Sequence, residues 1–110
     1  MLDAAPALHV VLMTCPPAAA EALLLRLLEE RLVGCGNILP GVRSCYWWEG
    51  EICRDEEALV VMETTPDRLA ALLERATQLH PYDVPKLVAL DPSAANQPYV
   101  AWLRAVTRPA

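Results

Sequence analysis

Four cysteines and two histidines carry the most reactive side chains of this 110-residue chain. The cysteines stand at positions 15, 35, 45 and 53, and no two of them form a Cys-x-x-Cys pair. A zinc ribbon or a thioredoxin-like redox motif is therefore unsupported. Each cysteine lies in or beside an apolar stretch, so we expect four free thiols, packed as small apolar groups in a reducing compartment.

Met13, Cys15 and His80 are the candidate metal ligands. Soft sulfur ligands suit Cu(I), whereas imidazole suits Cu(II) and zinc. Residues 13 and 15 would share one face of a strand, because side chains alternate along it. The alternative, which we favour, is a packed methionine and a buried cysteine. We therefore expect no obligatory cofactor, and only weak binding of copper or another divalent metal.

Nucleophilic catalysis would need a cysteine or serine next to a base. Cys35 and His80 are the one conceivable dyad, and nothing in the sequence brings them together. His9 alternates with apolar residues at a strand start, which favours a structural role. No glycine-rich phosphate loop is present. We predict that the protein is not an enzyme.

The composition excludes two classes of partner. The net charge is -5 and the pI is about 4.9, so the basic patch that nucleic acid requires is absent. No apolar run approaches the roughly 18 residues of a membrane span. The first residues carry Asp3 where a signal peptide has basic residues, so we expect a cytoplasmic protein. Apolar residues form 55% of the chain, which indicates a subunit interface as well as a core.

The order of the predicted elements is strand, helix, strand, strand, helix, strand, helix. The apolar run 8–14 predicts a central strand, and Gly34 is expected to cap the helix that follows Pro16-Pro17. Thr65-Pro66 predicts the start of the second long helix. The remaining predicted elements are strands at 35–48, 51–64 and 86–90 and a helix at 98–106.

Two glycine-containing pairs shape the second and third strands. Pro40-Gly41 predicts a bulge or bend within the second strand. Glu49-Gly50 predicts a tight turn that joins it to the third strand in a long hairpin arm. An isolated two-stranded arm is only marginally stable, so we expect it to pack against a neighbouring subunit. The whole pattern predicts an α+β, ferredoxin-like domain (βαββαβ plus a C-terminal helix) with an antiparallel sheet, covering residues 1–110 with a core at about 8–106.

Six motifs in order resemble the CutA family of divalent-cation tolerance proteins. They lie at 11–16 (Val-Leu-Met-Thr-Cys-Pro), 30–41 (Glu-Arg-Leu-Val-Gly-Cys-Gly-Asn-Ile-Leu-Pro-Gly), 44–50 (Ser-Cys-Tyr-Trp-Trp-Glu-Gly), 64–65 (Thr-Thr), 80–85 (His-Pro-Tyr-Asp-Val-Pro) and 99–103 (Tyr-Val-Ala-Trp-Leu). The resemblance implies a homotrimer of ferredoxin-like subunits, similar in architecture to PII signalling proteins. It also implies a role in tolerance of copper and other divalent metals. The alternative is a PII-like signalling or scaffold protein that binds a small ligand or a partner protein at clefts between subunits.

This chain departs from the family pattern at several positions, including Pro17, where the family often has Asp. Met13 and Leu79 stand where some members place a cysteine and a second histidine, both suggested copper ligands, so we expect weaker metal binding here. Glu63 and Lys86 reverse the charges that members commonly carry at these positions. We therefore predict a salt bridge between Glu63 and Lys86, within one subunit or between two.

The aromatic run before the turn is the expected trimer interface, made of Tyr46, Trp47 and Trp48. Interfaces between subunits are also common ligand sites. We expect such an inter-subunit cleft to be lined by Cys35, Trp48, Glu49, Glu63, His80, Tyr82 and Lys86.

Overall fold

The structure, a computed structural model, describes residues 6–109 of the chain. It contains four strands and three α-helices, two of which are preceded by a turn of 3-10 helix. The elements are β1 (His9–Cys15), η1 (Pro17–Ala19), α1 (Ala20–Glu29), β2 (Cys35–Trp48), β3 (Glu51–Thr64), η2 (Pro66–Arg68), α2 (Leu69–Leu79), β4 (Leu87–Leu90) and α3 (Gln97–Val106).

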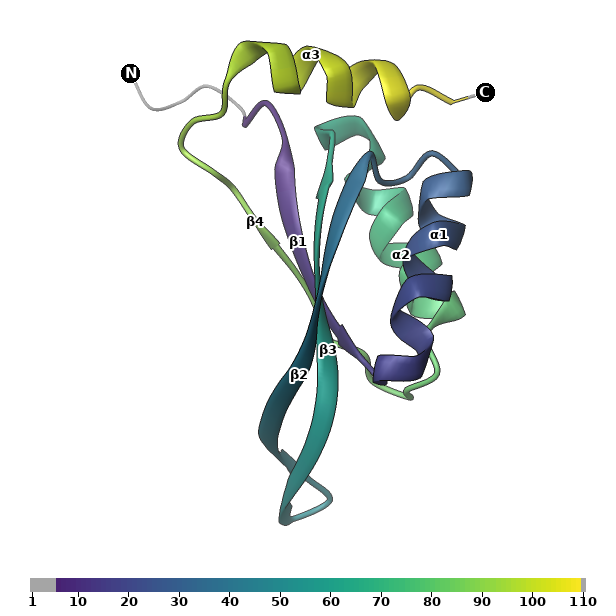
Figure 1. Ribbon diagram of the computed structural model, residues 1–110, viewed down its shortest axis with the longest axis vertical. Helices are drawn as coiled ribbons and strands as arrows, with labels where there is room; N and C mark the ends of the chain where they lie inside the picture. The colour runs from purple at the N-terminus through teal and green to yellow at the C-terminus, as the bar shows by residue number, and fades with distance from the viewer. Residues whose placement is uncertain (1–5, 110) are drawn as a thin grey trace.

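The four strands form one antiparallel sheet in the order β2-β3-β1-β4. β1 therefore lies between β3 and β4, as expected for a ferredoxin-like βαββαβ unit. α1 and α2 cover one face of the sheet, and α3 lies across the end opposite the arm (Figure 1). This arrangement confirms the predicted fold class.

The core lies between the sheet and the pair α1 and α2. Val11 and Met13 of β1 and Met62 of β3 point into it, and they meet Leu27 of α1 and Leu72 of α2. All five side chains are completely buried. Because side chains alternate along a strand, the residues between them face the other side of the sheet.

Among the described residues, neither α1 nor α2 covers the second face of the sheet. Leu39 of β2 and both Val88 and Leu90 of β4 lie on this face, and all three are exposed in the single chain. Only the end near α3 is covered, where Val10 packs against Leu8, Val100 and Leu103. Most of this face of the sheet is thus exposed in the single chain.

β2 and β3 continue beyond the sheet as the projecting hairpin arm (Figure 1). Glu49 and Gly50 form its turn with φ of 50° and 81°. Positive φ at both positions is typical of the tight turn that matches the twist of a hairpin. The register shifts between Leu39 and Val42, and Gly41 has a φ of 70°. Both predicted features, the tight turn and the bulge at Pro40-Gly41, are confirmed.

The end of α1 differs from the prediction. Arg31, with a φ of 62°, takes the left-handed position that we assigned to Gly34. The Arg31 amide donates to the carbonyl of Leu28 and the Leu32 amide to that of Leu27, both at 3.0 Å. This is a Schellman motif with a non-glycine residue in its left-handed position.

Gly34 is required for a different reason. A Cβ at this position would overlap the side chain of Leu103 and lie 3.0 Å from Val106 Cγ2. The missing side chain thus allows α3 to approach the segment that leads into β2. The backbone there needs no unusual conformation.

Thr65 also has a role other than the expected one. It precedes η2 with an extended backbone, but its side chain makes no capping hydrogen bond. Its hydroxyl instead lies 3.2 Å from that of Thr107, and both residues are buried. Thr107 in turn donates to the carbonyl of Leu103 at 2.8 Å, so these contacts join the start of α2 to the end of α3.

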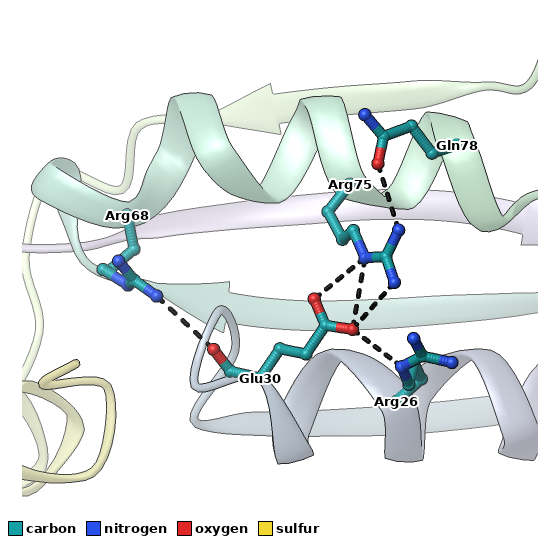
Figure 2. Close-up of polar contacts among 5 residues, drawn as sticks. All are labelled: Arg26, Glu30, Arg68, Arg75 and Gln78. Carbon is teal, nitrogen blue, oxygen red and sulfur yellow. Dashed lines mark hydrogen bonds and ion pairs between the residues drawn. The ribbon is translucent and has the colours of Figure 1, made fainter. Parts of the chain in front are cut away.

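A polar network joins the outer surfaces of α1 and α2. Arg75 donates to both carboxylate oxygens of Glu30 at 2.9 and 3.1 Å, and Arg26 donates to the same carboxylate at 2.7 Å (Figure 2). Arg68 donates to the backbone carbonyl of Glu30 at 3.4 Å. The hydrogen bond from Arg75, with that from Arg26, lowers the pKa of Glu30. These contacts join the C-terminal end of α1 to α2 on the outer side of the apolar core.

Among residues 6–109, no helix combines the length and the apolar character that crossing a membrane would require.

Candidate functional site

A groove of about 780 Å³ lies between the base of the arm and the segment that joins α2 to β4. The arm contributes side chains from two strands, and the joining segment supplies the opposite wall. Its lining includes Tyr46, Trp48, Asp55, Glu57, Tyr82 and Lys86. Trp48, Tyr82 and Lys86 were predicted to line a cleft between subunits, and the structure places these three in one groove of the single chain.

Two tyrosines hold two carboxylates in this groove. The hydroxyl of Tyr82 donates to Oε2 of Glu57 at 2.8 Å, and that of Tyr46 donates to Oδ2 of Asp55. Burial, together with the neighbouring Glu57, raises the pKa of Tyr82. The hydrogen bond to Asp55 raises the pKa of Tyr46 to about 12. Both phenols therefore stay protonated and act as donors at neutral pH.

Glu57 is the least expected group of the site. Its side chain belongs to a residue only 6% exposed, although it lies where β3 enters the arm. Among the described residues, no lysine, arginine or histidine nitrogen lies within 4.0 Å of its carboxylate. The site residues predicted from the sequence did not include Asp55 and Glu57. The signal was present, since alternation places residues 55 and 57 on the arm face that also carries Tyr46 and Trp48.

His80 lies beneath the groove and does not line it. Its Nε2 is 2.9 Å from the carbonyl of Thr14, and its Nδ1 accepts the amide of Tyr82 at 3.1 Å. A carbonyl must face a donor and an amide must face an acceptor, so the ring carries its proton on Nε2. Both nitrogens are thus used by the backbone, and the ring also contacts that of Tyr82, with centroids 4.7 Å apart.

Met13 and Cys15 are both completely buried in the core. Burial, aided by the nearby Glu57, raises the pKa of the Cys15 thiol, which disfavours the thiolate that a metal would need. With both His80 nitrogens occupied, the three candidate ligands leave no open coordination position within one folded chain. Residues 6–109 also hold no group of three or more His, Cys, Asp or Glu arranged around a common metal position.

The other predicted cleft residues separate into different places. Cys35 and Glu63 are paired in the register of β2 and β3, at the end of the sheet near α3. There Tyr99 donates to Oε1 of Glu63 at 2.7 Å. Burial, and after it the hydrogen bond to Glu63, raise the pKa of Tyr99. Glu49 lies in the turn at the tip of the arm.

Two pairs of residues that the sequence suggested, Glu63–Lys86 and Cys35–His80, are not in contact within the single chain, and the reason is the same for both. Glu63 lies opposite Val10, near the start of β1, whereas Lys86 directly precedes Leu87, which lies opposite Met13. The predicted Glu63–Lys86 salt bridge is therefore not formed within one subunit. His80 bonds to Thr14, also near the end of β1, so the Cys35–His80 dyad is likewise excluded. In each pair the residues belong to opposite ends of the sheet.

The predicted interface aromatics all lie on the arm and are exposed in the single chain. Trp47 is 72% exposed and faces away from Tyr46 and Trp48. Ile52, which lies opposite Trp47 in the hairpin, is exposed as well. The arm thus presents an apolar surface on each of its faces.

The chain matches known proteins over almost its whole length. The family described as "CutA1 divalent ion tolerance protein" matches residues 9–106. A divalent-cation tolerance protein CutA of Thermus thermophilus is 44% identical over 97 residues, which cover 87% of this chain and 94% of that protein.

Solved structures agree with this match. CutA1 from Oryza sativa has a TM-score of 0.88 and 39% identity, with 94% of this chain and 95% of that chain covered. CutA1 from Ehrlichia chaffeensis has a TM-score of 0.88 and 29% identity, with 96% and 99% covered. The chain therefore belongs to the CutA1 divalent ion tolerance protein family.

Proposed function

We propose that this protein takes part in the tolerance of divalent cations. The family match over residues 9–106 carries this proposal, and the Thermus thermophilus relative is named for the same role. The test is growth of a bacterial strain that lacks its own CutA protein, on increasing copper or zinc. Expression of this chain should restore the tolerance that the strain has lost. Failure to restore it, with the protein present and folded, would count against the role.

The working form that we propose is a homotrimer in which each arm packs against a neighbouring copy. The support is the bare apolar face of the sheet together with the exposed aromatics of the arm. A small protein rarely leaves large contiguous apolar patches in water. Covering them with other copies of the same chain would remove this surface from solvent.

Light scattering tests the assembly directly. The wild-type protein should have the mass of a trimer, whereas Trp47→Asp should dissociate or unfold it. Leu25→Asp is the matched control, because Leu25 is an exposed apolar residue on α1, away from the arm. A monomeric wild-type protein, or equal effects of the two variants, would contradict the proposal.

For metal binding we propose weak association with copper or another divalent ion and no resident cofactor. Met13 supplies a buried thioether and His80 has both ring nitrogens hydrogen-bonded, so neither supports a strong site in one subunit. Equilibrium dialysis of the trimer against copper and zinc should show weak binding that His80→Ala leaves unchanged. Tight copper binding that His80→Ala abolishes would overturn this proposal.

A PII-like signalling or scaffold role is the second candidate, and the groove beside the arm favours it. Its volume is within the range of about 300–1,000 Å³ usual for small-molecule sites.

A cytoplasmic location remains part of the proposal, and cell fractionation would test it. One rice relative is named as chloroplastic and one archaeal structure as periplasmic, so location varies among the relatives' names.

A further inference from the structure

A second hollow, of about 280 Å³, lies at the end of the molecule opposite the arm, beside α3 (Figure 1). It is located between η2, which precedes α2, and the end of α3, and it is lined by Thr65, Asp67, Arg104, Thr107 and Arg108. None of these five residues belongs to the arm or to the exposed face of the sheet. The hollow is therefore separate from the surfaces that the proposed trimer covers.

Among the described residues, two arginines that line this hollow have no acidic partner. Arg104 lies in the last turn of α3, and Arg108 follows two residues after its end. No carboxylate oxygen lies within 4.0 Å of either guanidinium, although Asp67 lines the same hollow. Two like charges around one hollow repel each other, whereas an anion between them is attracted by both. We propose that the hollow binds the phosphate group of a small phosphate monoester, held by Arg104 and Arg108.

Two buried hydroxyl groups fix the inner wall of the hollow. Thr107 donates to the carbonyl of Leu103 at 2.8 Å, so its own proton is used. The hydroxyl of Thr65 lies 3.2 Å from that of Thr107 and must be the donor of this second bond. The donors to an anion therefore come from the guanidinium groups, whose planar pairs of N–H groups match two oxygens of a phosphate.

Two further arginines raise the positive potential beside the hollow. Arg31 donates to the carbonyl of Val106 at 3.0 Å, and Nε of Arg68 donates to the carbonyl of Arg31 at 3.2 Å. Both acceptors are neutral, and among residues 6–109 no carboxylate oxygen lies within 4.0 Å of either guanidinium. Val106 directly precedes Thr107, so these contacts hold two uncompensated positive charges close to the hollow.

The charge and the size of the hollow favour a phosphate monoester over other anions. Its two arginines outnumber Asp67, and Arg31 and Arg68 add to the excess of positive charge. A phosphate monoester carries a charge of about −1.5 to −2 at pH 7, which is more than the single charge of a carboxylate or a sulfate ester. The volume is close to the lower limit of small-molecule sites, so it suits a phosphate with a small adjoining group. A long polyanion such as nucleic acid would be repelled by the net charge of -5 on the whole chain.

The test compares two probes of the same shape, phenyl phosphate and phenyl sulfate, on the full-length protein in its assembled form. The buffer contains no inorganic phosphate and has a pH of about 7.5, at which the phosphate monoester is mainly a dianion. Binding is measured by calorimetry and by the NMR shifts of the arginine Nε–H groups. Phenyl phosphate should bind at least about tenfold more tightly than phenyl sulfate, the scale of one additional charge-assisted hydrogen bond. Equal binding of the two probes, or binding of neither, would overturn the proposal.

Three substitutions of arginine locate the site. Arg104→Gln and Arg108→Gln should each reduce the affinity for phenyl phosphate about tenfold. Both residues are exposed, so each substitution removes a charge without disturbing the core. Arg54→Gln is the matched control and should leave the affinity unchanged, because Arg54 is an exposed arginine of the arm, at the other end of the molecule. Equal losses in all three variants, or no loss in the first two, would overturn the proposal.

Asp67→Asn should strengthen the binding of phenyl phosphate severalfold, since it removes a negative charge from the lining of the hollow. An unchanged affinity would place the phosphate elsewhere and contradict the proposed site. This inference is independent of the proposed metal tolerance. An Arg104→Gln variant that no longer binds phenyl phosphate and still restores growth on copper would separate the two.

Discussion

The backbone amide of Tyr82 donates a hydrogen bond to Nδ1 of His80 at 3.1 Å, while Nε2 of the same ring lies 2.9 Å from the carbonyl of Thr14. The imidazole therefore joins the segment after α2 to the last residues of β1. Tyr82 continues the connection to Glu57 on β3. Through these contacts, His80 fixes the wall of the groove that faces the arm.

We predict that His80→Ala destabilises the protein by about 1–3 kcal/mol, because it leaves the partly buried carbonyl of Thr14 without its donor. Urea unfolding at pH 7 would measure the change. His9→Ala is the control, since His9 pairs with the exposed Asp91 at 2.8 Å and should cost less than about 1 kcal/mol. Undiminished stability of His80→Ala together with a loss of metal binding would show that His80 is a ligand.

The second prediction concerns Glu30 and pH. Its pKa is lowered in the folded state by the hydrogen bond from Arg75 and by Arg26. The stabilisation is therefore fully present above the unfolded pKa of about 4.3. It is lost as the pH falls through the lower pKa of the folded state. Glu30→Gln should reduce stability at pH 7, and its difference from wild type should shrink as the pH falls below about 4.

Urea unfolding of both proteins from pH 7 to pH 3 would test this. Glu29→Gln is a suitable control, since Glu29 is a neighbouring acid on α1 without an ion pair among the described residues. A gap between wild type and Glu30→Gln that stays constant across this range would contradict the predicted direction of the pKa shift. Added salt at pH 7 should also narrow the gap, because the network is partly exposed.

Replacement of Gly34 should disturb the contact between α3 and the start of β2. An alanine Cβ would overlap Leu103, so we expect Gly34→Ala to cost about 1–3 kcal/mol. Gly34→Ala combined with Leu103→Val, which frees space at the same point, should lose less than the sum of the two single variants. Strict additivity in thermal unfolding would indicate that the two positions are not in contact.

The last prediction is that Glu63 pairs with Lys86 of another copy in the trimer. Within one chain they belong to opposite ends of the sheet, so only contact between subunits can bring them together. Glu63→Lys alone and Lys86→Glu alone should each weaken the trimer, because each places like charges together. The double reversal should restore it, as followed by light scattering against dilution. Trimers of equal strength in all four proteins would refute the pairing.

The sequence alone was sufficient for the fold and for the family. Apolar runs with strand or helix periodicity determine the element order. Pro40-Gly41 and Glu49-Gly50 indicate the bulge and the turn, because glycine readily adopts the positive φ found at Gly41 and Gly50. Predictions of a residue's role were less accurate where the same residue type can serve two structural roles. Gly34 was predicted to end α1 in the left-handed conformation, which Arg31 adopts instead. Thr65 was predicted to cap α2, but its hydroxyl lies beside that of Thr107.

Only the tertiary structure decided which residues form the groove. Cys35, Glu63 and His80 appeared to belong to one cleft, but the antiparallel register places Cys35 and Glu63 at the end of the sheet away from His80. The register also brings Glu57 under Tyr82, a contact between residues 25 positions apart that no local pattern encodes. Burial of Glu57 follows from this packing. Sequence periodicity determines which face a side chain occupies, whereas the register of the strands and the path of the segment after α2 determine what that side chain meets.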